Sequence, residues 1–600
     1  MTEKVFIVTR VVRRCGKNPL YIDSLAGFYP RYTMIARQKI QLTPRYYLDN
    51  FRYVLSFVER LYGKLLNEAE RGFIIRFGGL TDDAQCLYVR LSNRNRQFFR
   101  LGKLTYSEIT NLPAALDALL SNGFVEQLDA RHETLAGDVL DVFTKPELLE
   151  RLPLGAEEIR SLNKLKKDDL VQYVRQELNF GAVVSGLTAN ETVVLANFET
   201  EVMILKYLFF GNRGSDMTEF VMRDMGMANF ERYDETSFSP RFKTRRDVED
   251  KLLISLTNET FYALKTTETP AEDVYNWFLT WNETIHNPAR PALADIALPG
   301  YNKLICRVGA YLERQKLPEQ ALSIFELSDR VPARERRARL LFKTGLTGEA
   351  LALCDEMATT PQNADERYFA DDFKNKILGV AEKKRPRKAT TRFLADAESL
   401  NIPAGFRHHV EEGVINYYTE QGQSAAFTEN YPWRGLFGLV FWDIIHNATV
   451  QAIHHPLQRA PSDFYAPDFY PKREEQFKKR LAELTTADQW RQYVGRMFNA
   501  KHGLTNVLVD WNDDLLTLVN RIIERLDVAQ LGLILLEMAR NVREHTRGFP
   551  DLLTWNDVGE YEFVEVKSPT DHLGPQQLHW LEFFHTIGVR AKVVRVVWAV

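Results

Sequence analysis

The sequence lacks the features that mark membrane, secreted and disulfide-rich proteins. It has no run of eighteen consecutive apolar residues, and residues 1–14 have neither the apolar core nor the cleavage site of a signal peptide. The four cysteines lie far apart and form no CxxC pair, which argues against a cysteine-rich zinc module. We therefore expect a protein of the reducing cytoplasm, with no membrane as a partner.

The chain also lacks a strong charge of either sign. Its 77 basic and 80 acidic residues leave a net charge of −3, which excludes a uniformly cationic, histone-like protein but permits local basic patches. With 600 residues, 45% hydrophobic and 26% charged, the chain can bury sizeable cores. The length suggests about four domains.

The first predicted domain, residues 1–140, has the pattern of a winged-helix-like DNA-binding domain. Apolar residues at helical spacing predict a helix within residues 46–69, and alternation predicts a strand at residues 86–91. Residues 90–103 then contain arginines and phenylalanines but no acid, which predicts a basic, aromatic wing that contacts DNA phosphates. The alternative is a solvated basic edge with Phe98 and Phe99 facing inward.

A second DNA-binding element is predicted at residues 141–195. Residues 162–171 have the helix, short loop, helix pattern of a SAP-type motif, with lysines on the loop and at the start of the next helix. A plain amphipathic helix capped by Asp168 fits the same residues.

Residues 196–392 are predicted to form stacked helices that resemble tetratricopeptide (TPR) repeats. Residues 318–322 and 347–351 begin 29 positions apart, and each is predicted to open a second helix after a short turn. Residues 330–343, between them, contain six basic residues and one acid, which form either a solvated face or a phosphate pocket around Arg337. The basic stretch 383–392 contains Pro386, which disfavours a regular helix, and marks the boundary before the last domain.

The last predicted domain, residues 393–600, contains the pattern that points to chemistry. Two strand-like runs flank the turn Asn-Asp-Val-Gly-Glu at residues 556–560. A hairpin centred on Val558 places Asp551 opposite Glu565, with Cβ atoms about 5 Å apart. Lys567 lies two residues beyond Glu565 and therefore shares its face of the strand.

Two carboxylates and one amine on one face suit a metal-dependent nuclease. Close carboxylates repel each other, and a divalent cation such as Mg²⁺ or Mn²⁺ removes the conflict while leaving room for water and a phosphate. The cation can activate water, and the lysine can stabilise the charge that develops on the phosphate. The alternative is an exposed Glu/Lys alternation at a sheet edge.

These residues belong to a longer set of motifs. The set comprises residues 548–551 (GFPD), 564–569 (VEVKSP), 571–573 (DHL) and Gln577 with Trp580. It resembles the VRR-NUC branch of the PD-(D/E)xK nucleases. Residues 427–429, 436–445, 87–91 and 103–109 further resemble the Fanconi-associated nuclease family, in its bacterial form. The resemblance covers most of the chain and implies a mostly α, multi-domain protein with a C-terminal α/β nuclease domain.

The resemblance implies an enzyme that cuts 5′ flaps, digests DNA from 5′ to 3′ and acts in interstrand crosslink repair. Carried over residue by residue, it assigns one or two ions of Mg²⁺ or Mn²⁺ to Glu429, Asp551, Glu565 and the backbone carbonyl of Val566. It assigns Lys567 as the catalytic lysine, acting with Asp551 and Glu565. The partner it implies is branched or 5′-flap double-stranded DNA.

The family also binds a substrate 5′-phosphate in a basic pocket, for which Arg543 and Arg337 are the candidates. Two departures stand out. Gln576 occupies a position that is commonly basic in eukaryotic relatives, and no cysteine/histidine ubiquitin-binding finger is present. We expect a cytoplasmic, nucleoid-associated monomer. The alternatives are a four-way-junction resolvase and a non-catalytic, DNA-binding helical scaffold.

Overall fold

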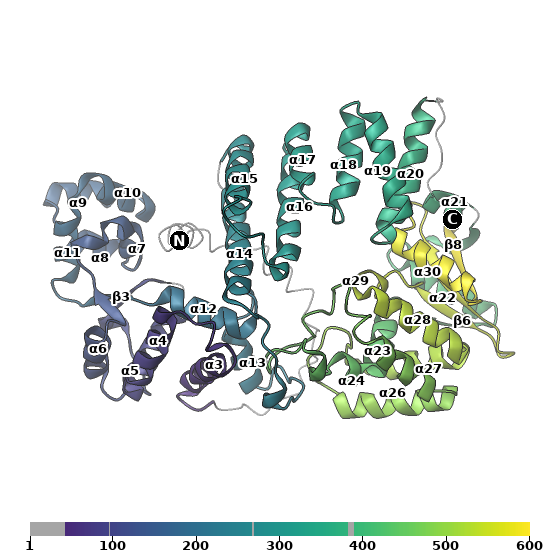
Figure 1. Ribbon diagram of the computed structural model, residues 1–600, viewed down its shortest axis with the longest axis horizontal. Helices are drawn as coiled ribbons and strands as arrows, with labels where there is room; N and C mark the ends of the chain where they lie inside the picture. Colours follow the sequence, from purple (N-terminus) through teal and green to yellow (C-terminus); the bar gives the residue numbers. More distant parts are fainter. Residues whose placement is uncertain (1–41, 95, 267–268, 382–388, 396, 600) are drawn as a thin grey trace. The chain divides into compact units, whose positions relative to one another are not determined.

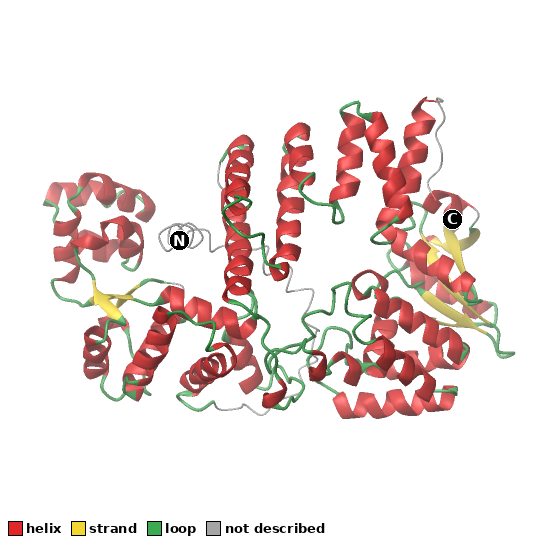
Figure 2. Cartoon of the chain, in the orientation of Figure 1, coloured by secondary structure: helices red, strands yellow, loops and turns green. Residues whose placement is uncertain are grey.

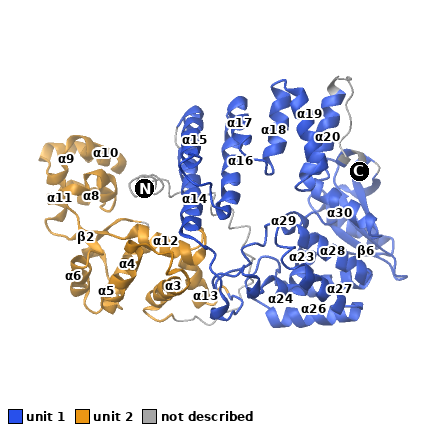
Figure 3. Cartoon of the chain, in the orientation of Figure 1, with its two compact units in different colours: residues 1–36, 229–600 blue, residues 37–228 orange. Residues whose placement is uncertain are grey.

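The computed structural model describes residues 42–599, apart from residues 95, 267–268, 382–388 and 396 (Figure 1). The chain is mostly helical, with a small sheet and a larger one (Figure 2). It divides into two compact units, residues 37–228 and residues 229–600 (Figure 3). Within the described ranges, no helix combines the length and apolar character needed to cross a membrane.

The unit formed by residues 37–228 consists of short helices around a three-stranded sheet. Strand β3 (Val193–Ala196) lies between β1 (Phe98–Arg100) and β2 (Val125–Gln127) and is antiparallel to both. The helices are α3 (Tyr46–Tyr62), α4 (Glu68–Gly78), α5 (Asp82–Ser92), α6 (Leu112–Ser121), α7 (Ala136–Asp141), α8 (Lys145–Arg151), α9 (Ala156–Leu162), α10 (Lys167–Glu177), α11 (Phe180–Thr188), α12 (Glu199–Phe210) and α13 (Thr218–Asp224).

The strand predicted at residues 86–91 is wrong, because these residues lie inside α5. The helix begins at Thr81, whose hydroxyl accepts a hydrogen bond from the backbone of Ala84. Every residue from Ala84 to Val89 is buried. A helix that is buried on all sides loses the polar face that produces a 3.6-residue period, so the sequence pattern resembled that of a strand.

Several residues of the predicted basic wing, residues 90–103, are buried or form ion pairs within the fold. Phe98 and Phe99 are buried, as in the alternative that the sequence left open. Arg90 pairs with Glu108 at 2.6 Å, and Arg100 is buried between two carboxylates. The prediction of phosphate contact is therefore kept only for the exposed residues of this segment.

Helices α9 and α10 confirm the predicted helix, loop, helix order near residue 165. The residue before α10 is Lys166, and Asp168 lies within the first turn. Capping by Asp168 is therefore wrong, although its charge still favours a helix N-terminus. The SAP-type assignment itself stays a prediction.

The first part of the other unit is an array of helices, seen side by side in Figure 1. The helices are α14 (Arg245–Thr266), α15 (Ala271–Ile285), α16 (Leu298–Arg314), α17 (Pro318–Phe325), α18 (Ala333–Lys343), α19 (Thr347–Thr359) and α20 (Ala364–Ala381). Helices α17 and α19 begin at the two echoed segments, as predicted. Their likeness to TPR repeats stays a prediction.

Helix α16 illustrates how the array packs. Leu304, Ile305, Val308 and Leu312 are buried at helical spacing and form one apolar face. Gly309 lies on the same face, where a Cβ atom would come within 2.8 Å of the Phe325 ring. A glycine at this position therefore allows α16 and α17 to approach closely. The stretch predicted as a domain boundary, residues 383–392, lies largely outside the described residues.

The C-terminal part contains a mixed five-stranded sheet, as predicted for an α/β region. Its order is β4–β8–β7–β6–β5, with β4 and β7 parallel to β8 and with β5 and β7 antiparallel to β6. The strands are β4 (Glu398–Pro403), β5 (Ser424–Phe427), β6 (Leu552–Trp555), β7 (Tyr561–Lys567) and β8 (Ala591–Ala599).

Helices cover this sheet and build the largest apolar core around it. Trp433, Phe549 and Trp580 stack within that core, with ring centroids 4.6 and 4.1 Å apart. The helices are α21 (Ala389–Ala395), α22 (Val410–Glu420), α23 (Tyr431–Val440), α24 (Trp442–Ile445), α25 (Glu474–Glu483), α26 (Ala487–Lys501), α27 (Leu515–Arg525), α28 (Val528–Arg540), α29 (Val542–His545) and α30 (Pro575–Thr586). This core fixes the segments before and after the β6–β7 hairpin.

Candidate functional site

The β6–β7 hairpin positions the predicted acids as its sequence indicates. Leu552 pairs with Val564 and Trp555 with Tyr561, so the register is centred on Val558. Continued by one pair, this register places Asp551 opposite Glu565. The backbone N–H of Val566 donates a hydrogen bond to Oδ2 of Asp551 at 2.7 Å, which fixes the orientation of that carboxylate.

Glu565 lies at the centre of the cluster and is fully buried. Its Oε1 accepts hydrogen bonds from Lys567 Nζ at 2.7 Å and from Gln577 Nε2 at 2.5 Å. The other oxygen, Oε2, is buried and has no hydrogen-bond partner among the described residues. A buried carboxylate oxygen without a partner is costly, and a bound cation would satisfy it.

Strand β5 brings Glu429 to the same place from a distant part of the sequence. Phe427 pairs with Leu552, and the next residue, Thr428, donates its backbone N–H to the carbonyl oxygen of Asp551 at 2.7 Å. Glu429 therefore follows directly beside Asp551. The negative charge of Glu429 contributes to the raised pKa values of both Asp551 and Glu565, so the three carboxylates form one electrostatic cluster.

Asn430 supports this arrangement in a way that the sequence did not reveal. It adopts a positive φ of 42°, donates a hydrogen bond to Glu429 Oε1 at 2.7 Å and accepts one from the backbone of Phe549 at 3.2 Å. One side chain therefore ties Glu429 to the segment that leads into Asp551. Asparagine tolerates such backbone angles better than most residues, which is the only sequence signal for this role.

Helix α30 supports the site from the other side through Gln577. Its Oε1 accepts the backbone N–H of Gly574 at 2.8 Å, and its Nε2 holds Glu565. Gly548 lets the chain pass close to this helix, because its φ is 85° and a Cβ atom there would lie 2.7 Å from Gln576. Because Oε1 of Gln577 is bound to Gly574, the amide of Gln577 directs its Nε2 at Glu565.

Burial and mutual repulsion raise the pKa values of the acids. Burial raises the pKa of Asp551 to about 7 and that of Glu565 to about 8, and neighbouring carboxylates add to both shifts. Burial raises the pKa of Glu429 as well, with a contribution from Glu411 on α22. Glu411 is an acid of this cluster that sequence reasoning missed, because its helix carries no distinctive motif.

The donor set fits a divalent cation. Asp551, Glu565 and Glu429 offer oxygen ligands, which Mg²⁺ and Mn²⁺ prefer, and Glu565 Oε2 is an unsatisfied buried acceptor. Val566 follows Glu565 in β7, with its N–H bound to Asp551. The use of its carbonyl as a ligand stays a prediction.

The two predicted phosphate-binding arginines have different surroundings. Arg543 is exposed, lies over the Tyr465 ring at 5.1 Å and is close enough to Lys303 to contribute to its lowered pKa, together with burial and Arg307. Arg337 forms an ion pair with Asp329 at 2.7 Å. The charge of Arg543 thus acts on Lys303 of α16, a residue that the sequence did not single out.

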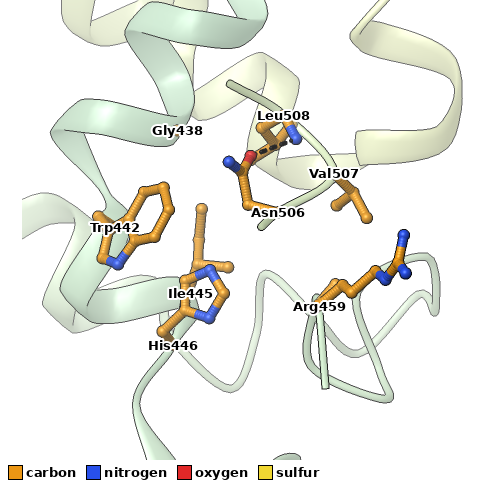
Figure 4. Close-up of a pocket in the computed structure, with 9 residues that line it drawn as sticks. Gly438, Trp442, Ile445, His446, Arg459, Asn506, Val507 and Leu508 are labelled. Carbon is orange, nitrogen blue, oxygen red and sulfur yellow. Dashed lines mark hydrogen bonds between the residues drawn. The ribbon is translucent and has the colours of Figure 1, made fainter. Parts of the chain in front are cut away.

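A small cavity lies among α23, α24 and the segments around Arg459 and Asn506 (Figure 4). Its volume is about 10 Å³, enough for one water molecule. Asn506 accepts a hydrogen bond from the backbone of Leu508 at its edge. None of the site carboxylates lines this cavity, so it is a packing feature rather than the functional site.

Two family models match this sequence. Residues 45–126 match the family described as "FAN1, HTH domain", and residues 485–598 match the VRR-NUC domain. The second match contains Asp551, Glu565 and Lys567, whereas Glu429 lies upstream of it. The chain belongs to the Fanconi-associated nuclease family.

Relatives of this family align with most of the chain. A Fanconi-associated nuclease 1 homolog of Pseudomonas aeruginosa is 28% identical over 564 residues, covering 93% of this chain and 96% of the relative. One from Arabidopsis thaliana is 24% identical over 92% of this chain and 67% of its own length. A crystal structure of paFAN1 bound to 5′-flap DNA with a 2-nucleotide flap and a gap superposes with a TM-score of 0.76 at 27% identity, covering 93% of this chain and 99% of that one.

Proposed function

We propose that this family member is a divalent-metal-dependent, structure-specific DNA nuclease that cleaves 5′-flap DNA. The observation that carries the proposal is the meeting of Glu429, Asp551 and Glu565, with Glu565 held by Lys567 and left with one unsatisfied buried oxygen. The similarity to a protein crystallised with 5′-flap DNA supports this substrate. The proposal includes 5′-to-3′ digestion and a role in interstrand crosslink repair, which the family resemblance implies.

Each residue of the site has its own role in hydrolysis. When bound, Mg²⁺ or Mn²⁺ supplies neutralisation of the scissile phosphate and a lowered pKa for water. Asp551, Glu565 and Glu429 would hold the cation, and Asp551 is oriented for this by the Val566 N–H. Lys567 lies 2.7 Å from Glu565 and presents its ammonium to the developing negative charge. Gln577 keeps Glu565 in position.

A basic cluster in the same unit suits the 5′-phosphate of the substrate. Burial lowers the pKa of Lys303, and the charges of Arg307 and Arg543 lower it further. A phosphate would relieve this repulsion and accept charge-assisted hydrogen bonds. We include Arg543 in this pocket with Lys303 and Arg307. Arg337 is proposed at its margin, because Asp329 already neutralises it.

The test is cleavage of labelled DNA by the full chain with Mg²⁺ or Mn²⁺. We expect incision of a 5′-flap duplex by the wild-type chain and none by Asp551→Asn, with Asp557→Asn as the matched control. Asp557 is an exposed carboxylate at the tip of the same hairpin. If Asp551→Asn and the wild type bind the flap equally and neither cleaves it, the nuclease proposal is wrong.

Product mapping separates the proposed specificity from that of a resolvase. We expect incision on the flap strand and much slower incision of a four-way junction. Symmetrical cuts across the four-way junction, with the flap left intact, would overturn the flap specificity while leaving the nuclease chemistry in place.

A further inference from the structure

Three side chains of metal-binding type meet behind the hairpin, outside the acid cluster. Glu537 lies on α28, His545 ends α29 and His579 lies on α30. One potential ligand atom from each residue lies within 4.8 Å of the others. The side chains are 11 to 16% exposed, so the group is nearly buried.

The distances in this group suit a metal ion better than hydrogen bonds. Glu537 Oε1 lies 3.4 Å from His545 Nδ1 and 3.3 Å from His579 Nε2, beyond the usual range of 2.7 to about 3.2 Å for a hydrogen bond. His579 Nε2 is buried and has no hydrogen-bond partner in the described part of the chain. Ligands at about 2.0–2.1 Å from a tetrahedral ion are separated by roughly 3.3–3.4 Å.

The carboxylate of Glu537 is oriented by an ion pair outside the group. Arg540 binds the other oxygen, Oε2, at 3.0 Å. Oε1 therefore remains directed at the two histidines with a negative charge, and Arg540 acts as an outer support of the kind that metal-binding carboxylates usually have.

We propose that Glu537, His545 and His579 form a zinc site separate from the acid cluster. Two imidazoles and one carboxylate are typical ligands of Zn²⁺, and water is the usual fourth ligand of a site with three protein ligands. Imidazole is a poor ligand for Mg²⁺, so the two sites select different ions.

Zinc binding requires a change of tautomer at His545 and a rotation of both imidazole rings. His545 Nδ1 now lies 2.8 Å from the carbonyl oxygen of Glu537, to which a neutral imidazole donates its proton. When Nδ1 binds zinc, this proton is lost and Nε2 takes one up, so the imidazole stays neutral and changes only its tautomer. The two rings are stacked at 4.4 Å with an interplanar angle of 17°, so they must turn to direct both lone pairs at one ion.

The ion would join three helices that support the active site. His579 lies two residues after Gln577, which holds Glu565, and His545 lies six residues before Asp551. A zinc ion at this position would fasten α28, α29 and α30 to one another. Its role is therefore structural: it stabilises the scaffold of the acid cluster without contacting the DNA.

The experiment measures zinc binding by the full chain in competition with a chromophoric chelator. It uses a chain that carries Asp551→Asn and Glu565→Gln, so that the acid cluster contributes little binding. We expect one zinc ion per chain, unaffected by millimolar Mg²⁺, together with a rise in the thermal midpoint that excess chelator reverses. If this chain binds no zinc beyond what a non-specific surface histidine holds, the proposal is wrong.

Variants of the ligands locate the ion. His579→Gln and His545→Gln are each expected to weaken zinc binding by roughly tenfold or more, since even loss of an indirect support costs about tenfold to a hundredfold. His572→Gln, an exposed histidine near the hairpin, is the matched control and should bind as the parent does. Equal zinc affinity in all three variants would place the ion elsewhere and refute the assignment.

Discussion

Two groups of buried charges in this protein behave in opposite ways. In the unit formed by residues 37–228, Arg100 binds Glu147 and Glu191, and Arg151 also binds Glu191. Lys103 also lies 3.7 Å from Glu147, and the pKa values of both carboxylates are lowered. In the acid cluster, Lys567 pairs with Glu565 at 2.7 Å, and the pKa values of Glu429, Asp551 and Glu565 are all raised.

The difference shows which charged residues stabilise the fold and which are available to bind a ligand. A balanced buried group is satisfied by its own partners, so it stabilises the fold and offers nothing to a ligand. An unbalanced group keeps its carboxylates partly protonated until a cation arrives. Arg100, which the sequence marked as part of a DNA-binding wing, belongs to the first kind, whereas the acids of the hairpin belong to the second.

The largest expected effect comes from removing an acid of the unbalanced group. Glu565→Gln should lower the single-turnover cleavage rate of a 5′-flap duplex on the order of 10³-fold at saturating Mn²⁺, because several kcal/mol of transition-state stabilisation are lost with the cation. The folded protein should be at least as stable, since a buried repulsive charge disappears. A Glu565→Gln chain that cleaves at the wild-type rate would contradict the comparison.

Removing a member of the balanced group should act on stability instead. Arg100→Met leaves Glu147 and Glu191 without their main partner, and we expect a loss of about 3–5 kcal/mol in the free energy of unfolding. Urea unfolding of the full chain, followed by circular dichroism, measures it. Arg131→Met, at an ion pair on the surface of the same unit, is the control and should change stability little. Similar losses in both variants would remove the distinction.

The pH dependence of stability should sharpen the comparison. The folded-state pKa values of Asp551 and Glu565, about 7 and 8, lie above those of an unfolded chain, about 4. The folded state therefore binds more protons in this range, and metal-free stability should fall as the pH rises from about 4 to 8. Thermal unfolding across this range, with a chelator and then with Mn²⁺, measures it.

Added Mn²⁺ should recover most of the stability lost at pH 8, because the cation replaces the protons. The Asp551→Asn, Glu565→Gln chain should show a flatter pH profile and little response to Mn²⁺. A profile that is the same in this chain and in the wild type would assign the pH dependence to other groups.

The smallest expected effect concerns Gln577, which supports the acid cluster from α30. Gln577→Leu removes the hydrogen bond to Glu565 and should raise the Mn²⁺ concentration needed for half-maximal cleavage by about tenfold to a hundredfold. DNA binding should be unchanged. A lower DNA affinity at constant metal dependence would mean that Gln577 contacts the substrate rather than positioning Glu565.

Local patterns were sufficient for the parts of the fold that depend on neighbours in sequence. The turn at residues 556–560 predicted the hairpin and its register, and this register places Asp551 opposite Glu565. The echoed segments at residues 318 and 347 likewise predicted where α17 and α19 begin. The strand predicted at residues 86–91 is wrong, because burial of α5 on all sides removes the periodic signal.

The sequence by itself determined the chemical type of each residue, the hairpin register and the set of motifs that identifies the family. Only the tertiary structure decided which charges are neutralised: Arg100 by Glu147, Arg337 by Asp329, and Glu565 only in part by Lys567. It also placed Glu411 in the acid cluster and brought Asn430 to the hairpin. The physical reason is that Coulomb energies and desolvation depend on distance and burial in three dimensions, which residues far apart in sequence acquire only when the chain folds.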